Sequence, residues 1–272
     1  MTQELFDRVT RLIGKKSMQR VHTLRIGIAG DGVVGNPLSA TWAKLGAKEI
    51  RNLDYDKVKR ENLANTFLLN PSYIGKDKDQ IATEISKKFS LRKLKVKSWH
   101  FDVTAPHNYN LLLKFVGGLD IVYGCFDNLP ARLSLNTATI TKNVKYLDIG
   151  IGGFAGRCRF INRKRACYAC NPLATEDQLN NIYKFSEEAD CDYAPTVTIL
   201  PVSFGIISHA IIQGLKFLEI VGNEPEYDYI YYDFLSEDRP VKMKITKRKD
   251  CIICGKNGMV NWSDLKLKRD SK

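Results

Sequence analysis

A short apolar segment followed by closely spaced glycines constrains the fold of this chain more than any other feature. Residues 24–29 have the length and composition of a buried strand, and they lead directly into Gly30-Asp-Gly-Val-Val-Gly35. The residues that follow, through Ala47, are typical of a helix. Because such glycines let the backbone and a helix N-terminus approach a phosphate closely, this order indicates a βαβ nucleotide-binding unit.

A second strand and an acidic residue extend this unit. The strand is predicted over residues 49–53, and Asp54 follows at its C-terminal end, where an acidic side chain binds ribose hydroxyls in such units. Gly30, Gly32, Gly35 and Asp54 are therefore candidate nucleotide-binding residues, and a purely structural tight turn is the alternative. Asp31 is unexpected in the loop, because its charge would lie near phosphate unless the side chain points away.

Helices and strands continue to alternate along the chain. Helices are predicted over 78–89, 108–116, 129–142 and 204–221, and strands over 95–101, 119–123, 145–147, 229–234 and 241–246. This pattern predicts an α/β fold, a Rossmann-type doubly wound sheet with helices on both faces. We expect one domain over residues 1–272, with an N-terminal helix over 1–20, a nucleotide-binding half over 21–166, and a second half over 167–272. A polar connection at 175–192 is expected to be a crossover in that second half.

Composition and charge say more about where the protein acts, and with what kind of partner, than about the reaction it catalyses. The net charge of +12 suits an acidic partner, although dispersed lysines and arginines also describe an ordinary solvated surface. Residues 1–14 lack the apolar segment of an export signal. The longest apolar stretch, 194–218, is interrupted by Pro201 and several polar side chains, which favours a buried helix over a membrane span. We therefore expect a cytoplasmic protein without membrane contact.

Four of the seven cysteines form two Cys-x-x-Cys pairs, Cys167 with Cys170 and Cys251 with Cys254. This spacing lets each pair supply two thiolates to one tetrahedral Zn²⁺, and redox-active pairs are the alternative. The metal would tie strands at the C-terminal end of the chain to the far half of the sheet. Cys125 and Cys158 lie in strand-like contexts and are expected to be core residues without a chemical role.

Several motifs occur in an order that resembles the ThiF/MoeB/HesA family of ubiquitin-like-protein-activating enzymes, over nearly the whole chain. They are the loop Gly30–Gly35, the run Asp54-Tyr-Asp-Lys-Val-Lys-Arg-Glu-Asn62-Leu, Gly75-Lys-Asp-Lys78, Cys125-Phe-Asp127-Asn128 with Arg132, and both cysteine pairs.

The resemblance implies ATP-dependent adenylation of the C-terminal glycine of a small ubiquitin-like or sulfur-carrier protein that ends in Gly-Gly. It implies that Lys78 contacts the phosphates, Asp127 holds Mg²⁺, Asp54 binds the ribose and Asn62 helps to seat the nucleotide. Asp56 and Asn128 belong to the same motifs. Taken singly, Lys78 has the alternative of a solvated helix residue, and Asp127 or Asn62 that of a turn or helix cap. The implied cofactors are ATP, Mg²⁺ and Zn²⁺, and the implied assembly is a homodimer.

The resemblance also bears on Arg11, Cys191 and Asn65. Arg11 corresponds to an arginine that reaches the ATP site of the partner in a dimer, and a plain surface arginine is the alternative. Cys191 lies where relatives carry a cysteine that forms a thioester or persulfide, but the acids at 187–190 would raise the pKa of its thiol. Asn65 stands where the family has an arginine, and we hypothesise that Lys76 or Arg60 replaces the missing phosphate contact.

Three other readings remain open. A nicotinamide-dependent dehydrogenase would also use the glycine loop and Asp54, but it has no need of Lys78, Asp127 or the cysteine pairs. An inactive nucleotide- and zinc-binding scaffold of the same fold would explain Asp31 and Asn65 as marks of a decayed site. Relatives that act on transfer RNA would suit the positive charge, but they generally lack the paired cysteines, so transfer RNA is the less favoured partner.

Overall fold

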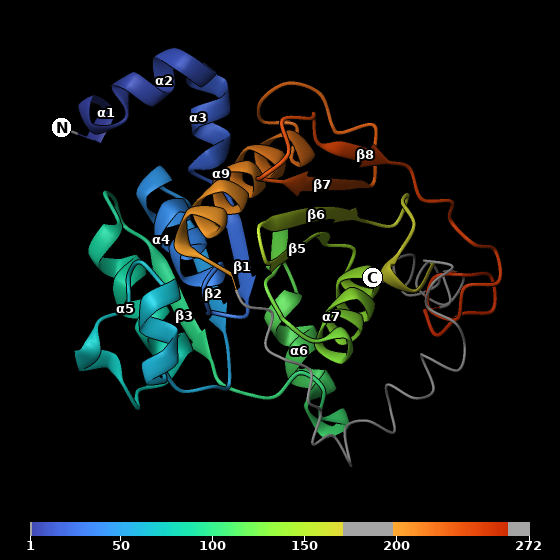
Figure 1. Ribbon diagram of the computed structural model, residues 1–272. Helices are drawn as coiled ribbons and strands as arrows, with labels where there is room; N and C mark the ends of the chain where they lie inside the picture. Colours follow the sequence, from blue (N-terminus) through green and yellow to red (C-terminus); the bar gives the residue numbers. More distant parts are fainter. Residues whose placement is uncertain (1, 171–197, 261–272) are drawn as a thin grey trace, which may run out of the picture.

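The computed structural model describes residues 2–170 and 198–260. Its centre is an eight-stranded sheet of order β3-β2-β1-β4-β5-β6-β7-β8 (Figure 1). The parallel strands are β1 (Arg25–Ala29), β2 (Glu49–Leu53), β3 (Lys95–Trp99), β4 (Ile121–Gly124) and β5 (Lys145–Gly152). The antiparallel strands β6 (Ala155–Ile161), β7 (Tyr229–Asp233) and β8 (Val241–Met243) extend the sheet beyond β5. The α/β prediction is confirmed.

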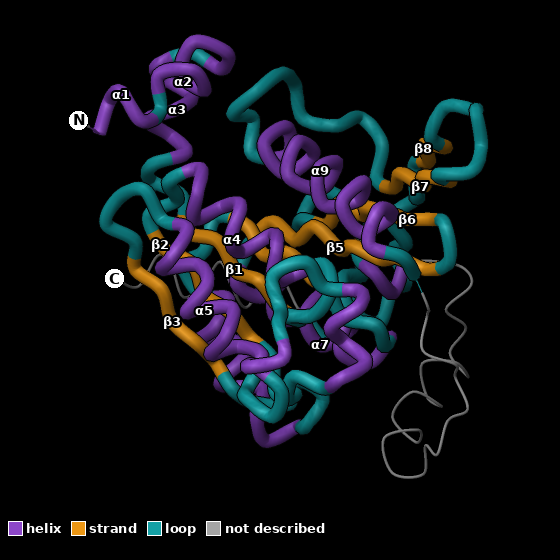
Figure 2. Tube along the Cα trace, turned by 60° about the vertical axis from the view of Figure 1, so that its left-hand side comes forward, coloured by secondary structure: helices purple, strands orange, loops and turns teal. Residues whose placement is uncertain are grey.

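Helices cover both faces of the sheet. One face carries α3 (Lys15–Val21), α4 (Gly35–Leu45), α5 (Lys78–Phe89) and α9 (Leu200–Phe217). Figure 2 shows α4 and α5 side by side along the first strands. The other face carries α6 (Tyr109–Val116) and α7 (Leu129–Lys142), which pack against each other (Figure 1). The strand order reverses between β1 and β4, so the parallel half is doubly wound as predicted.

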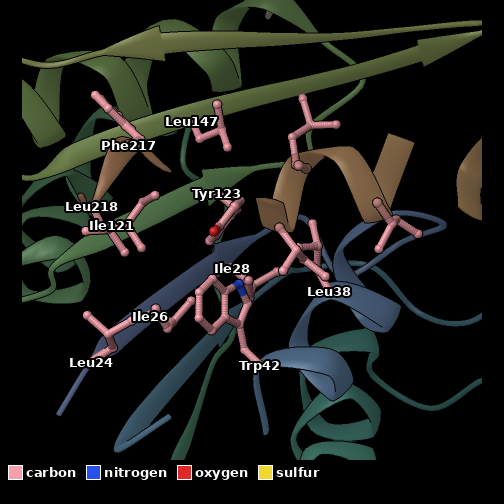
Figure 3. Close-up of a cluster of buried hydrophobic side chains, with 14 of the residues drawn as sticks. Leu24, Ile26, Ile28, Leu38, Trp42, Ile121, Tyr123, Leu147, Phe217 and Leu218 are labelled. Carbon is pink, nitrogen blue, oxygen red and sulfur yellow. The ribbon is translucent and has the colours of Figure 1, made fainter. Parts of the chain in front are cut away.

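A buried apolar cluster fixes the helix that follows the glycine loop (Figure 3). Leu38 and Trp42 of α4 are fully buried in one cluster with Ile28 of β1 and Tyr123 of β4. The ring centroids of Trp42 and Tyr123 lie 6.0 Å apart. Phe217 of α9 belongs to the same cluster, and α9 packs against β5. Packing therefore anchors α4 to β1 and β4, and this holds the loop at the N-terminus of α4 in place.

The N-terminal segment differs from the single helix expected over residues 1–20. It consists of three short helices, α1 (Thr2–Leu5), α2 (Asp7–Ile13) and α3. Gly14, between α2 and α3, has a φ of +88°, a conformation that favours glycine and ends a regular helix. Met18 and Val21 of α3 and Phe6, which precedes α2, are buried in the main core, so α3 and the start of α2 both attach the segment to the body of the protein.

Strand β5 and helix α9 have other bounds than expected. Strand β5 runs to Gly152, and the glycine-rich stretch 150–156 forms the hairpin that joins β5 to β6. Helix α9 begins at Leu200, with Pro201 in its first turn. Proline is tolerated there because the N–H groups of the first turn have no hydrogen-bond acceptor within the helix. Among the described residues, α9 alone is long and apolar enough to cross a membrane, yet it packs as a core helix on β5 and β6.

Candidate functional site

A cleft of about 990 Å³ opens at the carboxyl ends of the parallel strands, beside the point where the strand order reverses. It is lined by residues from the loop after β1, the end of β2, the 3₁₀ helix η1 (Arg60–Asn65), the start of α5, the start of α7 and the β5–β6 hairpin. Most of the sequence-predicted nucleotide residues line it: Gly30, Gly32, Asp54, Asp56, Asn62, Lys78, Asp127 and Asn128.

Each loop glycine has a different physical reason to be glycine. Gly30 has a φ of +94°, and a Cβ there would lie 2.8 Å from the carbonyl oxygen of Cys125. Gly35 lies beneath the loop, where a Cβ would come within 1.9 Å of the carbonyl oxygen of Gly30. Gly32 lines the cleft, and a Cβ there would meet nothing within 4 Å. Gly30 and Gly35 therefore shape the turn, while Gly32 leaves room for a ligand close to the backbone.

Two backbone N–H groups orient the Asp54 carboxylate. The N–H of Asp31 donates to Asp54 Oδ2 at 2.7 Å, and the N–H of Asp56 donates to Asp54 Oδ1 at 2.8 Å. Burial raises the pKa of Asp54, although nearby Lys78 and both hydrogen bonds oppose the rise. Each carboxylate oxygen retains a second lone pair, so Asp54 can still accept hydrogen bonds from two hydroxyls of a ligand.

Lys78 places a mostly buried ammonium group in the cleft. It is the first residue of α5, its side chain is 13% exposed, and its Nζ lies 2.9 Å from Asp56 Oδ2. Burial favours the neutral amine, but the carboxylates of Asp54 and Asp56 outweigh it and raise the pKa of Lys78. The group is therefore held in its charged form, as contact with a phosphate requires.

The start of α7 presents a carboxylate at the mouth of the cleft. Asn128 caps α7, since its side-chain oxygen accepts the N–H of Ala131 at 2.9 Å. Its amide nitrogen donates to Oδ1 of the exposed Asp127 at 3.2 Å. Asn62 likewise accepts the N–H of Lys59 at 2.9 Å while lining the cleft. Asn62 and Asn128 therefore each cap a helix and also line the cleft. Asp127 has oxygen lone pairs left that could bind a hydrated Mg²⁺.

Sequence reasoning missed a buried charge network behind the cleft. Asp148 of β5 is fully buried and accepts hydrogen bonds from Arg132, from Arg157 Nη1 at 2.9 Å and from the Tyr146 hydroxyl at 2.8 Å. Arg132 and Arg157 both line the cleft. A Cβ at Gly150 would lie 2.6 Å from Arg157 Nε, so this glycine lets the arginine cross β5. No local sequence pattern marks this contact, because Gly150 and Arg157 face each other only in the folded β5–β6 hairpin.

Lys76 and Arg60, the two candidates for the phosphate contact that Asn65 cannot make, do not line the cleft. Asn65 itself lines the cleft. Lys76 instead lies over the ring of Tyr73, with its Nζ 5.4 Å from the centroid, and Arg60 is exposed on η1. The structure thus does not bring Lys76 or Arg60 to the cleft, where the arginines are Arg132 and Arg157.

One arginine and three cysteines that the sequence analysis considered have different outcomes. Arg11 lies on α2 with a side chain that is 73% exposed and paired with Asp7, and it does not line the cleft. Cys191 lies outside the described residues. Cys158 is fully buried in the core as expected. Cys125, also expected to be a core residue, is only partly buried and lines the cleft, because it directly follows β4 at the sheet edge.

The four paired cysteines meet in one buried cluster. Their sulfur atoms all lie within 4.8 Å of one another. Cys167 Sγ lies 3.5 Å from Cys251 Sγ, and Cys170 Sγ lies 3.4 Å from Cys254 Sγ. Four thiolates at zinc–sulfur distances of about 2.3 Å in a tetrahedron are separated by about 3.8 Å. The cluster thus has the donor set and the size of a structural metal site, and it connects the segment after β6 to the C-terminal part of the chain.

Comparison with known proteins agrees with these motifs. The ThiF family profile matches residues 6–253. Ubiquitin-like modifier-activating enzyme 5 of Drosophila melanogaster is 26% identical over 248 residues, which are 87% of this chain and 59% of the relative. SUMO-activating enzyme subunit 2 of Dictyostelium discoideum is 26% identical over 176 residues, which are 64% of this chain and 26% of the relative. The chain therefore spans about 59% of the length of ubiquitin-like modifier-activating enzyme 5.

Solved structures share the fold at low sequence identity. MccB of E. coli, crystallised with ATP, superposes with a TM-score of 0.70 at 19% identity, covering 88% of this chain and 69% of MccB. PaaA superposes with a TM-score of 0.72 at 14% identity, covering 90% of this chain and 83% of PaaA. The profile match over most of the chain, with the fold and the motifs in their expected places, shows that the protein belongs to the ThiF family.

Proposed function

We propose that the cleft binds Mg·ATP and adenylates the C-terminal carboxylate of a small ubiquitin-like or sulfur-carrier protein. The observation that carries this proposal is the convergence of the glycine loop, Asp54, Lys78 and Asp127 on one cleft. The names of the sequence relatives, which are activating enzymes for ubiquitin-like modifiers, and the ATP complex of MccB support it.

The charges in the cleft suit a polyphosphate that arrives with a divalent cation. Four carboxylates line it, those of Asp54, Asp56, Glu61 and Asp127, against the three cations Lys78, Arg132 and Arg157. Asp148, behind the cleft, further neutralises both arginines. A bare triphosphate would therefore meet excess negative charge. Mg²⁺ held by Asp127 would supply the missing positive charge at the phosphates.

The chemistry asked of the protein is positioning and charge stabilisation. A carboxylate oxygen of the carrier attacks the α-phosphorus, a phosphorus–oxygen bond forms, and pyrophosphate leaves with the electrons of the broken bond. Asp54 fixes the ribose, the backbone at Gly32 approaches the phosphates, and Lys78 stabilises negative charge on them. Asn65 cannot make the phosphate contact of an arginine, and neither Lys76 nor Arg60 lines the cleft to replace it, so Lys78 is the lysine that contacts the phosphates.

Asp31 does not oppose phosphate binding, because its side chain is turned away. It is fully buried, it is absent from the cleft lining, and neither carboxyl oxygen has a hydrogen-bond partner among the described residues. Burial, reinforced by Asp54 and Asp79, raises the pKa of Asp31 well above its ordinary value of 3.8. The raised pKa favours the uncharged acid, which does not repel phosphate. Asp31 is thus compatible with an active site as well as with a decayed one.

The later chemistry and the assembly remain proposals. A thioester or persulfide step at Cys191 and a dimer that brings Arg11 to a partner's cleft follow from the family resemblance. A nicotinamide-dependent dehydrogenase would give Lys78 and Asp127 no role in binding or catalysis. A melting-temperature measurement with Mg·ATP distinguishes the proposed enzyme from an inactive scaffold. Mg·ATP should raise the melting temperature only if the cleft binds nucleotide.

ATP–pyrophosphate exchange with each small protein of the same genome that ends in Gly-Gly tests the proposal. We expect at least one of them to support exchange. Lys78→Ala should then lower the exchange rate by about 10²-fold or more, because a charge-stabilising contact to the phosphates is lost. Lys76→Ala is the matched control and should retain activity, since Lys76 does not line the cleft. Absence of exchange with every such protein, or equal rates for Lys78→Ala and wild type, would contradict the proposal.

The cysteine cluster is proposed to hold one structural Zn²⁺. Cys251→Ser should abolish stoichiometric zinc in elemental analysis. Loss of a metal site belongs to the few changes that cost about 4 kcal/mol or more, so the melting temperature should fall by roughly 10 °C. Ile252→Ser is the control, because Ile252 lies between the ligands but is 38% exposed, and it should keep the metal. Full zinc occupancy in Cys251→Ser would refute the assignment.

The buried Asp31 predicts a pH-dependent cost of folding. Above its unfolded-state pKa, near 3.8, the unfolded chain loses the proton that the folded chain retains. Stability therefore falls as pH rises toward the raised folded-state pKa. Asp31→Asn lacks this proton, so its stability relative to wild type should increase as pH rises above about 4, by up to about 1.4 kcal/mol per pH unit. Urea titrations measure the difference, and exposed Asp238→Asn serves as control. A difference that is independent of pH would show that Asp31 is already ionised in the fold.

A further inference from the structure

A second cavity adjoins the nucleotide cleft on the side of the cysteine cluster. Its volume is about 700 Å³, and we call it the basic cavity. Arg157 and Tyr168 line both hollows, and Arg157 Nη2 donates to the Tyr168 hydroxyl at 3.1 Å. This hydrogen-bonded pair is therefore the boundary between them. A chain that enters the cleft over Arg157 passes through the basic cavity first.

The lining of the basic cavity is cationic and contains no carboxylate among the described residues. Arg157, Arg159, Lys244 and Arg248 contribute to it. Two of these charges are already balanced, since Arg157 pairs with Asp148 at 2.9 Å and Arg248 with Asp250 at 2.8 Å. Within the described part of the chain, Arg159 and Lys244 have no acidic partner. At Arg159 and Lys244 the cavity thus offers positive charge that no carboxylate of the described residues balances.

Arg159 is the strongest sign that this charge serves a ligand. The residue is only 3% exposed, and its Nε has no hydrogen-bond partner among residues 2–170 and 198–260. Its Nη2 donates to the carbonyl oxygen of Cys167 at 2.8 Å, and its guanidinium lies 4.6 Å from the ring centroid of Tyr168. These contacts fix the group without neutralising it. A buried guanidinium with an idle donor is costly unless an anion completes it.

The spacing of side chains along β6 indicates how an extended peptide would lie in the basic cavity. Arg157 and Arg159 are two residues apart on β6 and share the face opposite Cys158, so they are about 7 Å apart along the strand. An extended peptide has the same two-residue spacing. A tail whose end passes Arg157 into the cleft would bring a residue at least two positions upstream next to Arg159.

We propose that the basic cavity selects carrier proteins with acidic side chains in the tail segment that precedes Gly-Gly. The inference rests on the proposed function, because it needs a carrier tail that ends in the nucleotide cleft. A polypeptide suits the cavity better than a free anion does, since Tyr229, Met243 and Ile245 also line it and offer apolar contacts. Arg159 and Lys244 are thus specificity-determining residues, which bind the tail away from the reacting atoms.

Labelled peptides test this with the full-length protein. Ten-residue fluorescein peptides ending in Gly-Gly carry Glu, Gln or Lys at the third to sixth positions from the C-terminus, and binding is followed by anisotropy at physiological salt. The Glu peptide should bind at least about tenfold tighter than the Gln peptide, and the Lys peptide weakest. Lys244→Glu should remove the preference for Glu and improve binding of the Lys peptide. Lys242→Glu makes the same charge change outside the cavity and should preserve the preference.

The outcomes separate this inference from the proposed function. Equal binding of the Glu and Gln peptides, no binding of the Glu peptide at millimolar concentration, or an unchanged preference in Lys244→Glu would each overturn it. If the peptides bind equally but pyrophosphate raises the melting temperature of wild type and not of Lys244→Glu, the cavity holds a free anion instead. ATP–pyrophosphate exchange with a carrier that lacks acids before Gly-Gly would overturn the selectivity and leave adenylation standing.

Discussion

A single buried carboxylate joins the parallel part of the sheet to its antiparallel part. Asp148 lies on β5, the last parallel strand, and receives Arg132 from α7 and Arg157 from the antiparallel strand β6. Removing one member of such a buried cluster leaves an uncompensated charge, which costs about 3–5 kcal/mol. The nucleotide cleft needs both arginines in its wall, and the basic cavity needs Arg157 at its boundary. The geometry of both hollows therefore depends on Asp148.

Residues that are close in the sequence made much of the fold predictable. Helices α5 and α7 have the bounds that the pattern predicts, 78–89 and 129–142. The glycine loop also lies where local spacing puts it, because a strand, a tight turn and a helix N-terminus are determined by neighbouring residues. The zinc-ligand spacing likewise anticipated a cluster whose members are 84 residues apart across the two pairs.

What the sequence did not reveal depends on contacts between distant elements. The strand predicted over 145–147 continues to Gly152, although glycine disfavours strands, because residues 150–152 pair with residues 155–157 of β6. Gly150 is small so that Arg157 can cross it, and no local pattern marks that contact. The sequence left open whether Asp31 faces the phosphates or points away, and in the structure its side chain is buried and does not line the cleft. Each of these follows from packing, which a linear pattern does not encode.

The central claim is that a carrier carboxylate attacks the α-phosphorus of ATP in the cleft. It is tested most directly by oxygen transfer, using Gly-Gly carriers of the same genome labelled with ¹⁸O at the C-terminal carboxylate and hydroxylamine as the acyl acceptor. The attacking oxygen becomes part of the phosphate, and it remains there when hydroxylamine breaks the acyl carbon–oxygen bond. The account predicts that mass spectrometry finds AMP with one ¹⁸O for at least one carrier. AMP without label, or no AMP with any of them, would contradict it.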